Sequence, residues 1–480
     1  MEIRSASKIA VIGAGTMGVG IAQVAAASGH PVVVVDRDEA AIAKGKDMLG
    51  ASLDHLVKRG RLEAERTDAI AAQIDWSTQI RTVSGSALVI EAIIERLDVK
   101  QALFAEVEDI VGGDVLLATN TSSLSIAEIS KGLEKPERFL GLHFFNPVPT
   151  MKLVEVVASA ATSAELVETA TGLMESWGKH PAIVRDVPGF IVNRVARPYY
   201  AEAFIAWAEG VEPAVIDLAL TGSGGFRMGP LALADMIGHD INYAAAVSVH
   251  EGLHLHARFR PQGAQAKLVE QGNLGRKSGQ GVYRYGADMP PLPVRDGRAG
   301  AIIHLPPRPG AAADLIAELS APVDPKLAPG VLSVDGLRVA MGDGRSLGAR
   351  QDIDVLIDHA LNFRVASFLV ATVRDEEGAQ GAAGLAGALG KQILLVPDRP
   401  GQIVLRTYAQ LANGAIDAVC EDVASADAID EAMLYGANYP VGPVVWAVHT
   451  GLNYVREMLH NIASETGDRL YEPGKGWTSL

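Results

Sequence analysis

The stretch that decides the fold lies near the N-terminus, where residues 8–36 read KIAVIGAGTMGVGIAQVAAASGHPVVVVD. Residues 8–12 form a short apolar run, glycines follow, and the Ala-rich segment 21–28 has the small and apolar residues of a packed helix. The β-branched run 32–35 has no polar alternation, as a parallel strand covered on both faces requires. The order strand, turn, helix, strand predicts a βαβ unit at the start of a doubly wound parallel sheet.

The glycine-rich turn of this unit has the G-x-G-x-x-G spacing of a dinucleotide-binding loop. Gly13 permits the tight turn, Gly15 lets the backbone approach a pyrophosphate, and Gly18 allows the helix to pack closely on the strand. Asp36 ends the second strand 18 residues after Gly18, where an acidic side chain accepts hydrogen bonds from an adenosine ribose and repels a 2′-phosphate. The spacing therefore favours NAD over NADP, although the neighbouring Arg37 is of the type that accommodates that phosphate. A glycine-rich turn without a ligand is the alternative.

The 480 residues exceed what one hydrophobic core organises, so the chain is expected to contain several domains. Apolar runs alternate with helix-like stretches at first, which predicts an α/β domain over residues 1–184. Long helical patterns then predict an all-α domain over residues 185–288. Six prolines between positions 289 and 310 disfavour regular structure and predict a linker over 289–310. An eroded α/β connecting segment is predicted over residues 311–396.

An internal repeat predicts that residues 397–480 form a second helical domain. DVPGFIVNR at residues 186–194 recurs as DRPGQIVLR at residues 398–406, a shift of 212, and a Gly-Lys pair precedes both copies by eight residues. A later MGPL returns as VGPV, shifted by 213. A chance match of Pro-Gly pairs is the alternative. Asn193 becomes Leu405, so the second copy keeps packing positions, loses polar ones, and is expected to be structural.

Charge and cysteine content restrict the partners and the compartment. The chain has 42 Lys and Arg against 57 Asp and Glu, a formal net charge of −15, which argues against a broad nucleic-acid or anionic-membrane surface. Its single cysteine, Cys420, permits neither an internal disulfide nor a cysteine-rich zinc site, and no metal is expected. No signal-peptide core and no run of about 18 apolar residues is present, so we expect a soluble, cytoplasmic protein without nucleic-acid or membrane partners.

Five motifs occur in the order typical of one enzyme family. They are GAGTMG at residues 13–18, EAIIE at 91–95, TNTSSL at 119–124, GLHFFNPVPTMKLVEV at 141–156 and PGFIVNR at 188–194. Together they closely resemble the L-3-hydroxyacyl-CoA dehydrogenases over residues 7–285, and the remainder resembles longer bacterial members with a repeated C-terminal domain. The resemblance implies a Rossmann domain followed by two tandem helical domains of the 6-phosphogluconate-dehydrogenase type. It also implies reversible, NAD-dependent oxidation of an L-3-hydroxyacyl-CoA, such as 3-hydroxybutyryl-CoA or 3-hydroxyadipyl-CoA, in fatty-acid or aromatic-acid (phenylacetate) metabolism.

Oxidation of a secondary alcohol needs a hydride acceptor and a base that removes the hydroxyl proton. The resemblance implies that His143 is this base and Glu155 its partner, and that Ser122 and Asn193 hydrogen-bond the reacting oxygen. Without the resemblance, a His and a Glu 12 residues apart are more often a buried histidine and a solvated carboxylate. Ser122 would equally suit a helix cap, and Asn193 a surface amide.

The resemblance further implies which residues bind the cofactor and coenzyme A. Ser52, Arg59 and Ser122 would contact coenzyme A, whose phosphates need local cations in an acidic protein; a solvated charged loop is the alternative. Arg227 stands where the family usually has proline, which reflects either acyl-chain specificity or a variant turn. The predicted cofactor-binding residues are Gly13, Gly15, Thr16, Met17, Gly18, Asp36, Glu95, Lys100, Asn146 and Lys277.

Two other functions remain open at this stage. A dehydrogenase of a non-CoA hydroxy acid would have no use for a basic hairpin around Arg59. A catalytically silent NAD-binding relative would not need the intact set of four polar residues assigned to catalysis. Family members with one helical domain dimerise through it, so we expect either a homodimer or a monomer whose two helical domains pair within the chain. The single glycine-rich fingerprint predicts one active site per chain.

Overall fold

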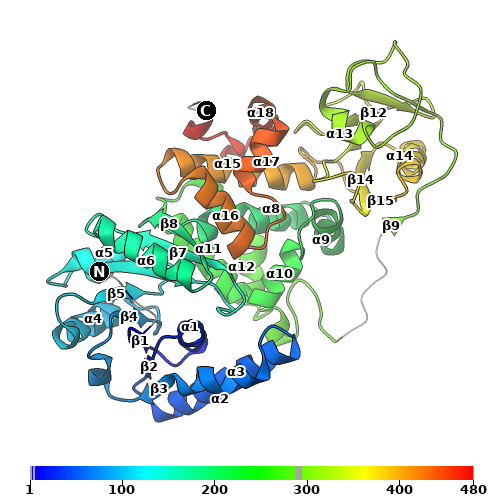
Figure 1. Ribbon diagram of the computed structural model, residues 1–480. Coiled ribbons are helices and arrows are strands. Elements are labelled where there is room, and N and C mark those ends of the chain that lie inside the picture. The colour runs from blue at the N-terminus through cyan, green and yellow to red at the C-terminus, as the bar shows by residue number, and fades with distance from the viewer. Residues whose placement is uncertain (1–2, 4–5, 287–293, 479–480) are drawn as a thin grey trace. The chain divides into compact units, whose positions relative to one another are not determined.

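The computed structural model describes residue 3, residues 6–286 and residues 294–478. The chain divides into two compact units, whose elements are labelled in Figure 1. The first unit combines Met1–Val192 with Asp422–Ala437, and the second combines Asn193–Glu421 with Asn438–Leu480. A short segment from late in the sequence therefore belongs to the N-terminal unit.

An eight-stranded sheet forms the first unit, in the order β3-β2-β1-β4-β5-β6-β7-β8. Strands β1 to β6 are parallel, β7 is antiparallel to β6, and β8 is parallel to β7. The predicted doubly wound parallel sheet is thus extended by two strands of opposite direction. The strands are β1 (Ile9–Ile12), β2 (Val32–Val35), β3 (Ile74–Ser77), β4 (Leu88–Glu91), β5 (Leu116–Thr119), β6 (Phe139–Phe144), β7 (Leu153–Ala158) and β8 (His180–Arg185).

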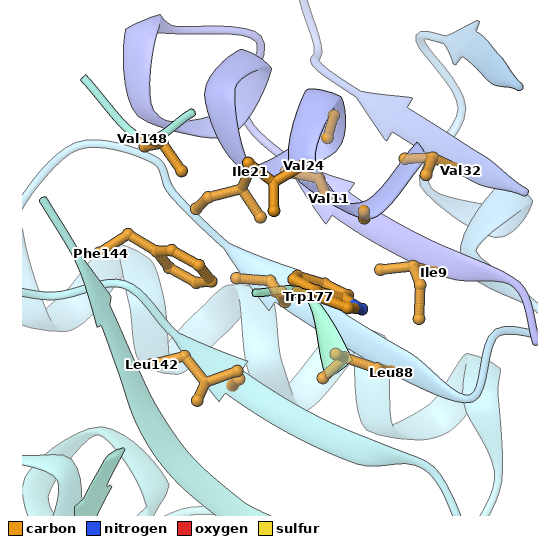
Figure 2. Packing of buried hydrophobic residues seen from close by; sticks show 14 of the residues in the cluster. Ile9, Val11, Ile21, Val24, Val32, Leu88, Leu142, Phe144, Val148 and Trp177 are labelled. Carbon is orange, nitrogen blue, oxygen red and sulfur yellow. The ribbon is translucent and has the colours of Figure 1, made fainter. Parts of the chain in front are cut away.

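Helices connect and cover these strands. Strands β1 and β2 are buried throughout, because the apolar β-branched runs of the sequence are covered on both faces. Figure 2 shows Ile21 and Val24 of the first helix directed into a core that also contains Phe144 and Trp177. The helices of this sheet are α1 (Thr16–Ala27), α2 (Glu39–Lys58), α3 (Ala64–Ala72), α4 (Leu97–Val111), α5 (Ile126–Ser130) and α6 (Ala164–Ser176).

The second unit begins with the predicted helical domain. Gly238 has φ of 102°, a conformation that side chains disfavour, and it divides one long helical pattern into α10 and α11. The helices here are α7 (Val192–Val195), which starts at the last residue of the first unit, then α8 (Arg197–Ala208), α9 (Pro213–Gly222), α10 (Pro230–Ile237), α11 (His239–Gly252) and α12 (Gly263–Glu270). The second helical copy contains α15 (Val404–Cys420), α16 (Ala426–Gly436), α17 (Pro443–Thr450) and α18 (Leu452–Thr466).

A second sheet of seven strands lies between the two helical copies in the sequence, in the order β10-β11-β12-β13-β14-β15-β9. It corrects the predicted linker over 289–310, because β9 and β10 both belong to the sheet; the linker residues before 294 lie outside the described residues. Both strands are two residues long and occupy the two edges, where prolines flank a strand without interrupting a ladder. The strands are β9 (Val294–Arg295), β10 (Ile303–His304), β11 (Val331–Val334), β12 (Leu337–Met341), β13 (Val355–Ile357), β14 (Phe368–Val373) and β15 (Gln392–Leu395).

This second sheet repeats the latter half of the first. The pairs β12–β13, β13–β14 and β14–β15 are parallel, antiparallel and parallel, as are β5–β6, β6–β7 and β7–β8. Helix α14 (Glu376–Ala388) connects β14 to β15 as α6 connects β7 to β8. A β11–β12 hairpin stands where the first sheet has parallel strands. The segment predicted to be an eroded α/β region therefore contains half of a Rossmann sheet.

Each helical copy contributes one helix to the sheet of the other copy. Helix α16 packs on β7 and β8 within the first unit, where the backbone N–H of Arg185 also donates to Val423 O over 2.9 Å. Helix α9 packs on β14 within the second unit, where Ser223 Oγ donates to Phe368 O over 2.8 Å. We call α9 and α16 the exchanged helices.

Candidate active site

The glycine turn after β1 has the shape of a pyrophosphate cradle. Gly13 has φ of 115°, and a Cβ atom there would lie 2.5 Å from the carbonyl oxygen of Ala92. A Cβ atom on Gly18 would collide with the Gly13 carbonyl, so helix and turn pack too closely for a side chain. No atom lies within 4 Å of the corresponding position on Gly15, which caps α1 without a side-chain hydrogen bond. This leaves room for a ligand beside Gly15, and the first N–H groups of a helix suit an anion.

Asp36 lies beside this turn. Its Oδ2 accepts the N–H of Ala14 over 2.9 Å and its Oδ1 accepts the N–H of Asp38 over 3.2 Å, so the carboxylate is fixed at the carboxyl edge of β2. Thr16 is exposed at the start of α1, and Met17 packs partly buried against the core. This part of the structure fits the adenosine and pyrophosphate of a dinucleotide.

His143 and Glu155 face each other across β6 and β7, where the strand register pairs them directly. His143 Nδ1 lies 2.5 Å from Glu155 Oε2, and Glu155 Oε1 accepts the N–H groups of Ile191 and Val192 over 2.9 Å each. Glu155 has no exposed surface and His143 is 6% exposed. With Nδ1 bound to the carboxylate, Nε2 is the imidazole nitrogen left for a substrate proton.

Aromatic rings surround this imidazole. The ring centres of Phe145 and Phe190 lie 4.5 Å and 5.7 Å from that of His143. Both rings limit the access of water, which strengthens the electrostatic effect of the buried Glu155 on the imidazole.

Glu95 organises the loop after β5. Its Oε1 accepts Thr121 Oγ1 over 2.6 Å, the N–H of Ser122 over 2.9 Å and Ser123 Oγ over 3.0 Å. Burial raises the pKa of Glu95, but the Lys100 ammonium and the bonds from Thr121 and Ser122 outweigh it, so the pKa lies below its ordinary value. Glu95 is thus held ionised at the loop that carries Ser122.

Ser122 does not cap the following helix. Ser125 is the N-cap of α5, and its side chain accepts the N–H of Glu128 over 3.3 Å. Ser122 is half-buried on the loop ahead of that cap. Its predicted role at the substrate oxygen stays a prediction, with the helix-cap alternative removed.

Lys100 lies beneath this loop and is 1% exposed. Its Nζ is 2.5 Å from Glu91 Oε1 and 3.2 Å from Glu95 Oε2, and Glu91 also accepts Thr119 Oγ1 over 2.7 Å. The predicted effect of Lys100 on a cofactor would therefore pass through Glu95, which the ammonium orients.

A hollow of about 230 Å³ opens beside the end of α2. It brings together Ser52 and Arg59, two of the three residues predicted for coenzyme A, whereas the third, Ser122, is not among its lining residues. Ser52 Oγ donates to Gln23 Oε1 over 2.7 Å, which ties α2 to α1. The lining residues are Ser52, His55, Leu56, Arg59, Arg61, Pro147, Pro149 and Thr150.

Asn146 lies on the loop 145–152 between β6 and β7, which also forms one wall of this hollow, and its side chain is exposed. The start of this loop is connected to the end of β5, because Asn120 Oδ1 accepts the N–H of Phe144 over 2.9 Å. The predicted cofactor contact of Asn146 stays a prediction.

Three predicted residues belong to the second unit. Asn193 is half-buried in α7 and directly follows Val192, whose N–H binds Glu155. Lys277 Nζ lies 2.5 Å from Asp240 Oδ1, and Arg227 is exposed between α9 and α10. The contributions of these residues to the site stay predictions.

Glu91, Asn120 and Thr121 were not predicted, although all three lie in quoted motifs. Glu91 ends the buried strand β4 and Asn120 follows β5, which places both at the carboxyl edge where α/β sheets bind ligands. Their position at the end of a predicted strand could have identified Glu91 and Asn120 from the sequence. Their contacts with Lys100, itself a predicted residue, and with Phe144 were not predicted, because these partners come from separate elements.

The second copy lacks the His–Glu pair. The matching strand registers place Asp358 at the position of His143 and Val370 at that of Glu155. Asp358 accepts the N–H groups at the start of α15, from Ile403, Val404 and Leu405 over 2.9, 2.7 and 3.0 Å. The second copy therefore keeps a carboxylate that binds the start of a helix, as Glu155 does in the first copy. Its cross-strand neighbour is Val370, so this carboxylate has no imidazole to hold.

Within the described residues, no group of three or more His, Cys, Asp or Glu side chains could hold a metal ion. No described helix is both long and apolar enough to cross a membrane.

A glycine cradle after the first strand, together with a buried carboxylate that holds an imidazole on the same Rossmann sheet, is typical of an oxidoreductase that uses a dinucleotide. The family model for the NAD-binding domain of 3-hydroxyacyl-CoA dehydrogenase matches residues 8–187. The model for the C-terminal domain of 3-hydroxyacyl-CoA dehydrogenase matches residues 189–285 and again 401–480. The chain therefore belongs to the 3-hydroxyacyl-CoA dehydrogenase family and carries the C-terminal domain in duplicate.

Relatives of known name agree with this assignment. The chain is 40% identical over 470 residues to a 3-hydroxyadipyl-CoA dehydrogenase of Escherichia coli (strain K12), covering 97% of this chain and 95% of that one. It is 41% identical over 279 residues to a probable 3-hydroxybutyryl-CoA dehydrogenase of Deinococcus radiodurans, covering 58% of this chain and all of that one. The crystal structure of a 3-hydroxybutyryl-CoA dehydrogenase from Escherichia coli K12 matches with a TM-score of 0.89 and 38% identity, covering 99% and 98% of the two chains.

These matches confirm the predicted family, fold class and cofactor. The protein is an NAD-dependent oxidoreductase of 3-hydroxyacyl-CoA, and the alternatives of a silent relative and of a non-CoA dehydrogenase are no longer needed.

Proposed function

We propose that His143 is the general base of this oxidation, that Glu155 orients it, and that Ser122 and Asn193 hold the reacting oxygen. The observation that carries the proposal is the 2.5 Å bond from His143 Nδ1 to a carboxylate that is itself fixed by two backbone N–H groups. Such a pair has the geometry needed for proton transfer at Nε2.

The bond to Glu155 determines which nitrogen acts. Glu155 Oε2 accepts the proton on Nδ1, which leaves the lone pair on Nε2 to take the proton from the substrate hydroxyl. The imidazolium that results is stabilised by the adjacent carboxylate in a site with little water. Bound NAD supplies the hydride acceptor for this step. In the reverse direction, the imidazolium returns the proton to the oxygen.

Ser122 and Asn193 carry the remaining polar groups of the proposed site. Their hydroxyl and amide would donate hydrogen bonds to the substrate oxygen, which polarises the carbonyl in the direction of reduction. The bonds from Glu95 to the loop of Ser122 support this role, because they fix the backbone that carries the hydroxyl.

The hollow beside α2 supports binding of the coenzyme A part of the substrate. Arg59 and Arg61 supply cations for its phosphates, and Ser52 supplies a hydroxyl. Among acyl groups we propose short chains with a terminal carboxylate, as in 3-hydroxyadipyl-CoA, because the Escherichia coli relative with this name matches nearly the whole chain. We further propose that the reaction occurs in the cytoplasm.

The test of the proposed base compares His143→Ala with the control His180→Ala. His180 is a half-buried histidine of the same unit, and its ring stacks on Tyr435. NADH formation is followed spectrophotometrically with 3-hydroxybutyryl-CoA and 3-hydroxyadipyl-CoA, and with the free hydroxy acids. We expect His143→Ala to lower kcat by about 10²- to 10⁴-fold, His180→Ala to stay near wild type, and only the thioesters to react. Turnover of His143→Ala near that of wild type would remove the residue from its role.

A further inference from the structure

Lys179 is a buried cation that the proposed reaction does not use. It lies between α6 and β8 and is 7% exposed. Its Nζ donates to the carbonyl oxygens of Val148 and Met151 over 2.5 and 2.8 Å, and among the described residues no carboxylate forms an ion pair with it. Burial lowers the pKa of Lys179 to about 8. An apolar side chain of similar length would avoid the cost of burying this charge, so its presence requires a reason.

Both acceptors of this ammonium belong to the loop 145–152. This loop connects β6 to β7, the strands of His143 and Glu155. Val148 is buried in the core next to α1, where a Cβ atom on Gly20 would lie 2.8 Å from Val148 Cβ; Figure 2 shows this side chain beside Ile21. The loop is therefore held on one side by α1 and on the other by Lys179.

The same loop carries two parts of the proposed binding site. Asn146 is the amide predicted to contact the cofactor. Pro147, Pro149 and Thr150 form the wall of the hollow that also contains Arg59. A shift of the loop would change the position of Asn146 and the width of the hollow together.

The internal repeat provides a comparison. Lys391 precedes β15 as Lys179 precedes β8, it is 9% exposed, and its Nζ donates to the carbonyl oxygens of Ala366 and Arg364 over 2.7 and 3.5 Å. Its loop connects β13 to β14, where the His–Glu pair is absent. The repeat thus contains the same buried ammonium at a place without the proposed site.

We propose that Lys179 is a positioning residue of the dehydrogenase, whose ammonium holds the loop 145–152 where Asn146 and the hollow can bind cofactor and thioester. The inference rests on the proposed function, because it assigns a purpose to the loop through the ligands bound there. It predicts that replacing Lys179 weakens the binding of cofactor and thioester, whereas replacing the equivalent Lys391 does not.

The experiment compares Lys179→Met, Lys179→Arg and the matched control Lys391→Met in the full chain. The dissociation constant of NAD is measured by calorimetry, KM and kcat with 3-hydroxybutyryl-CoA, and stability by thermal unfolding. For Lys179→Met we expect the NAD dissociation constant and KM each to rise about tenfold with kcat changed less than about threefold, because charge-assisted hydrogen bonds to the loop are lost. Lys391→Met should leave the NAD dissociation constant, KM and kcat near wild type, and Lys179→Arg should restore binding, because a guanidinium can also donate to two carbonyls.

The proposal is overturned if Lys179→Met lowers the melting temperature but leaves KM and the NAD dissociation constant near wild type, or if Lys391→Met weakens binding equally. If Lys179→Met does not fold, Lys179→Gln replaces it; its amide keeps a donor, so we expect a smaller loss of binding, and unchanged binding overturns the proposal. A wild-type protein that binds NAD but turns over no hydroxyacyl-CoA would contradict the proposed function. The comparison of NAD affinities among the variants would still decide the role of Lys179.

Discussion

The two oxygens of Glu155 have different partners, and this division determines how the residue responds to substitution. Oε2 accepts from His143 Nδ1, and Oε1 accepts from Ile191 and Val192 at the start of α7. The side chain therefore fixes the tautomer of the imidazole and also holds the start of α7, the helix that contains Asn193. A substitution that keeps the shape of the side chain but replaces one acceptor oxygen with a donor group separates these two tasks.

Glu155→Gln makes that change. Its amide oxygen can still accept the two backbone N–H groups, so its NH₂ group would face Nδ1 and drive the imidazole proton to Nε2, where it blocks the base. We expect kcat to fall about 10²- to 10⁴-fold with KM changed by only a few fold, while the exposed control Glu175→Gln on α6 stays at wild-type rates. Steady-state kinetics with both substrates measure this, and a kcat above half that of wild type would contradict it.

Lys179 gives a pH dependence whose sign is fixed by its burial. Its pKa is about 8 in the folded protein against an ordinary value of 10.5, so the folded state binds the proton more weakly than the unfolded state. Relative to Lys179→Met, the wild type should gain stability as the pH rises from about 8 to about 10.5, by about 3 kcal/mol at most, and show a constant difference below that range. Urea unfolding of both proteins at several pH values measures the difference, and parallel stability curves would refute it.

Sequence motifs were sufficient for the residues whose chemistry is local. The glycine turn and Asp36 were found from spacing, and His143 and Glu155 from the family resemblance, which the strand register then brought face to face. Lys179 and Glu91 were not found, because their bonds depend on burial and on carbonyl or ammonium groups of other elements. Spacing along the chain contains no information about such partners.

Among the elements, continuous apolar strands were predicted better than short edge strands. The strands β1 and β2 are buried runs with a strong local pattern. By contrast, β9 and β10 have two residues each and exist only through pairing with β15 and β11. The prolines around them correctly indicated that no long strand or helix forms there, but gave no indication of the pairing. The reversal of β7 and β8 was not predicted either, because an apolar run does not specify strand direction.

Helix α15 depends on one carboxylate from the second sheet. Asp358 is 1% exposed and accepts three backbone N–H groups at the start of this helix. Replacing Asp358 with Ala leaves those donors buried and unpaired, and should lower the free energy of unfolding by about 2–4 kcal/mol. Because the position has no imidazole partner, KM and kcat should be unchanged at a temperature where the variant is folded.

Asp358→Asn is the matched control for that substitution. It keeps one carbonyl oxygen as acceptor and should therefore lose less stability than Asp358→Ala. Chemical denaturation orders the three proteins, and equal losses in both variants would show that the bonds to the start of α15 do not matter.

For the whole molecule, the exchanged helices connect each helical copy to a sheet from the other part of the sequence. Gly436 of α16 packs so closely that a Cβ atom there would lie 3.2 Å from Val192 Cγ2, next to the start of α7. We infer that the C-terminal copy takes the place of a second subunit, which would account for a copy that retains packing residues without the His–Glu pair. The alternative of a homodimer built from full chains is tested by the mass of the protein in solution.

A chain that ends at residue 288 should behave differently from the full chain. It lacks α16, so the face of β7 and β8 that this helix covers would be exposed to water. We expect such a chain to self-associate or aggregate, as seen by light scattering, and to melt at a lower temperature than the full chain. A soluble monomer of unchanged melting temperature would contradict the view that the second copy replaces a subunit.

The position of α16 in the sequence also sets the order of folding during synthesis. The last residue of β8 is Arg185 and the first residue of α16 is Ala426, so about 240 residues must be translated between them. At a translation rate of about 5–20 residues per second, β7 and β8 are synthesised on the order of ten to fifty seconds before the helix that covers them. During that interval the face of β7 and β8 that α16 covers stays open in the nascent chain, and we expect chaperones to bind the hydrophobic side chains on it, such as Leu153.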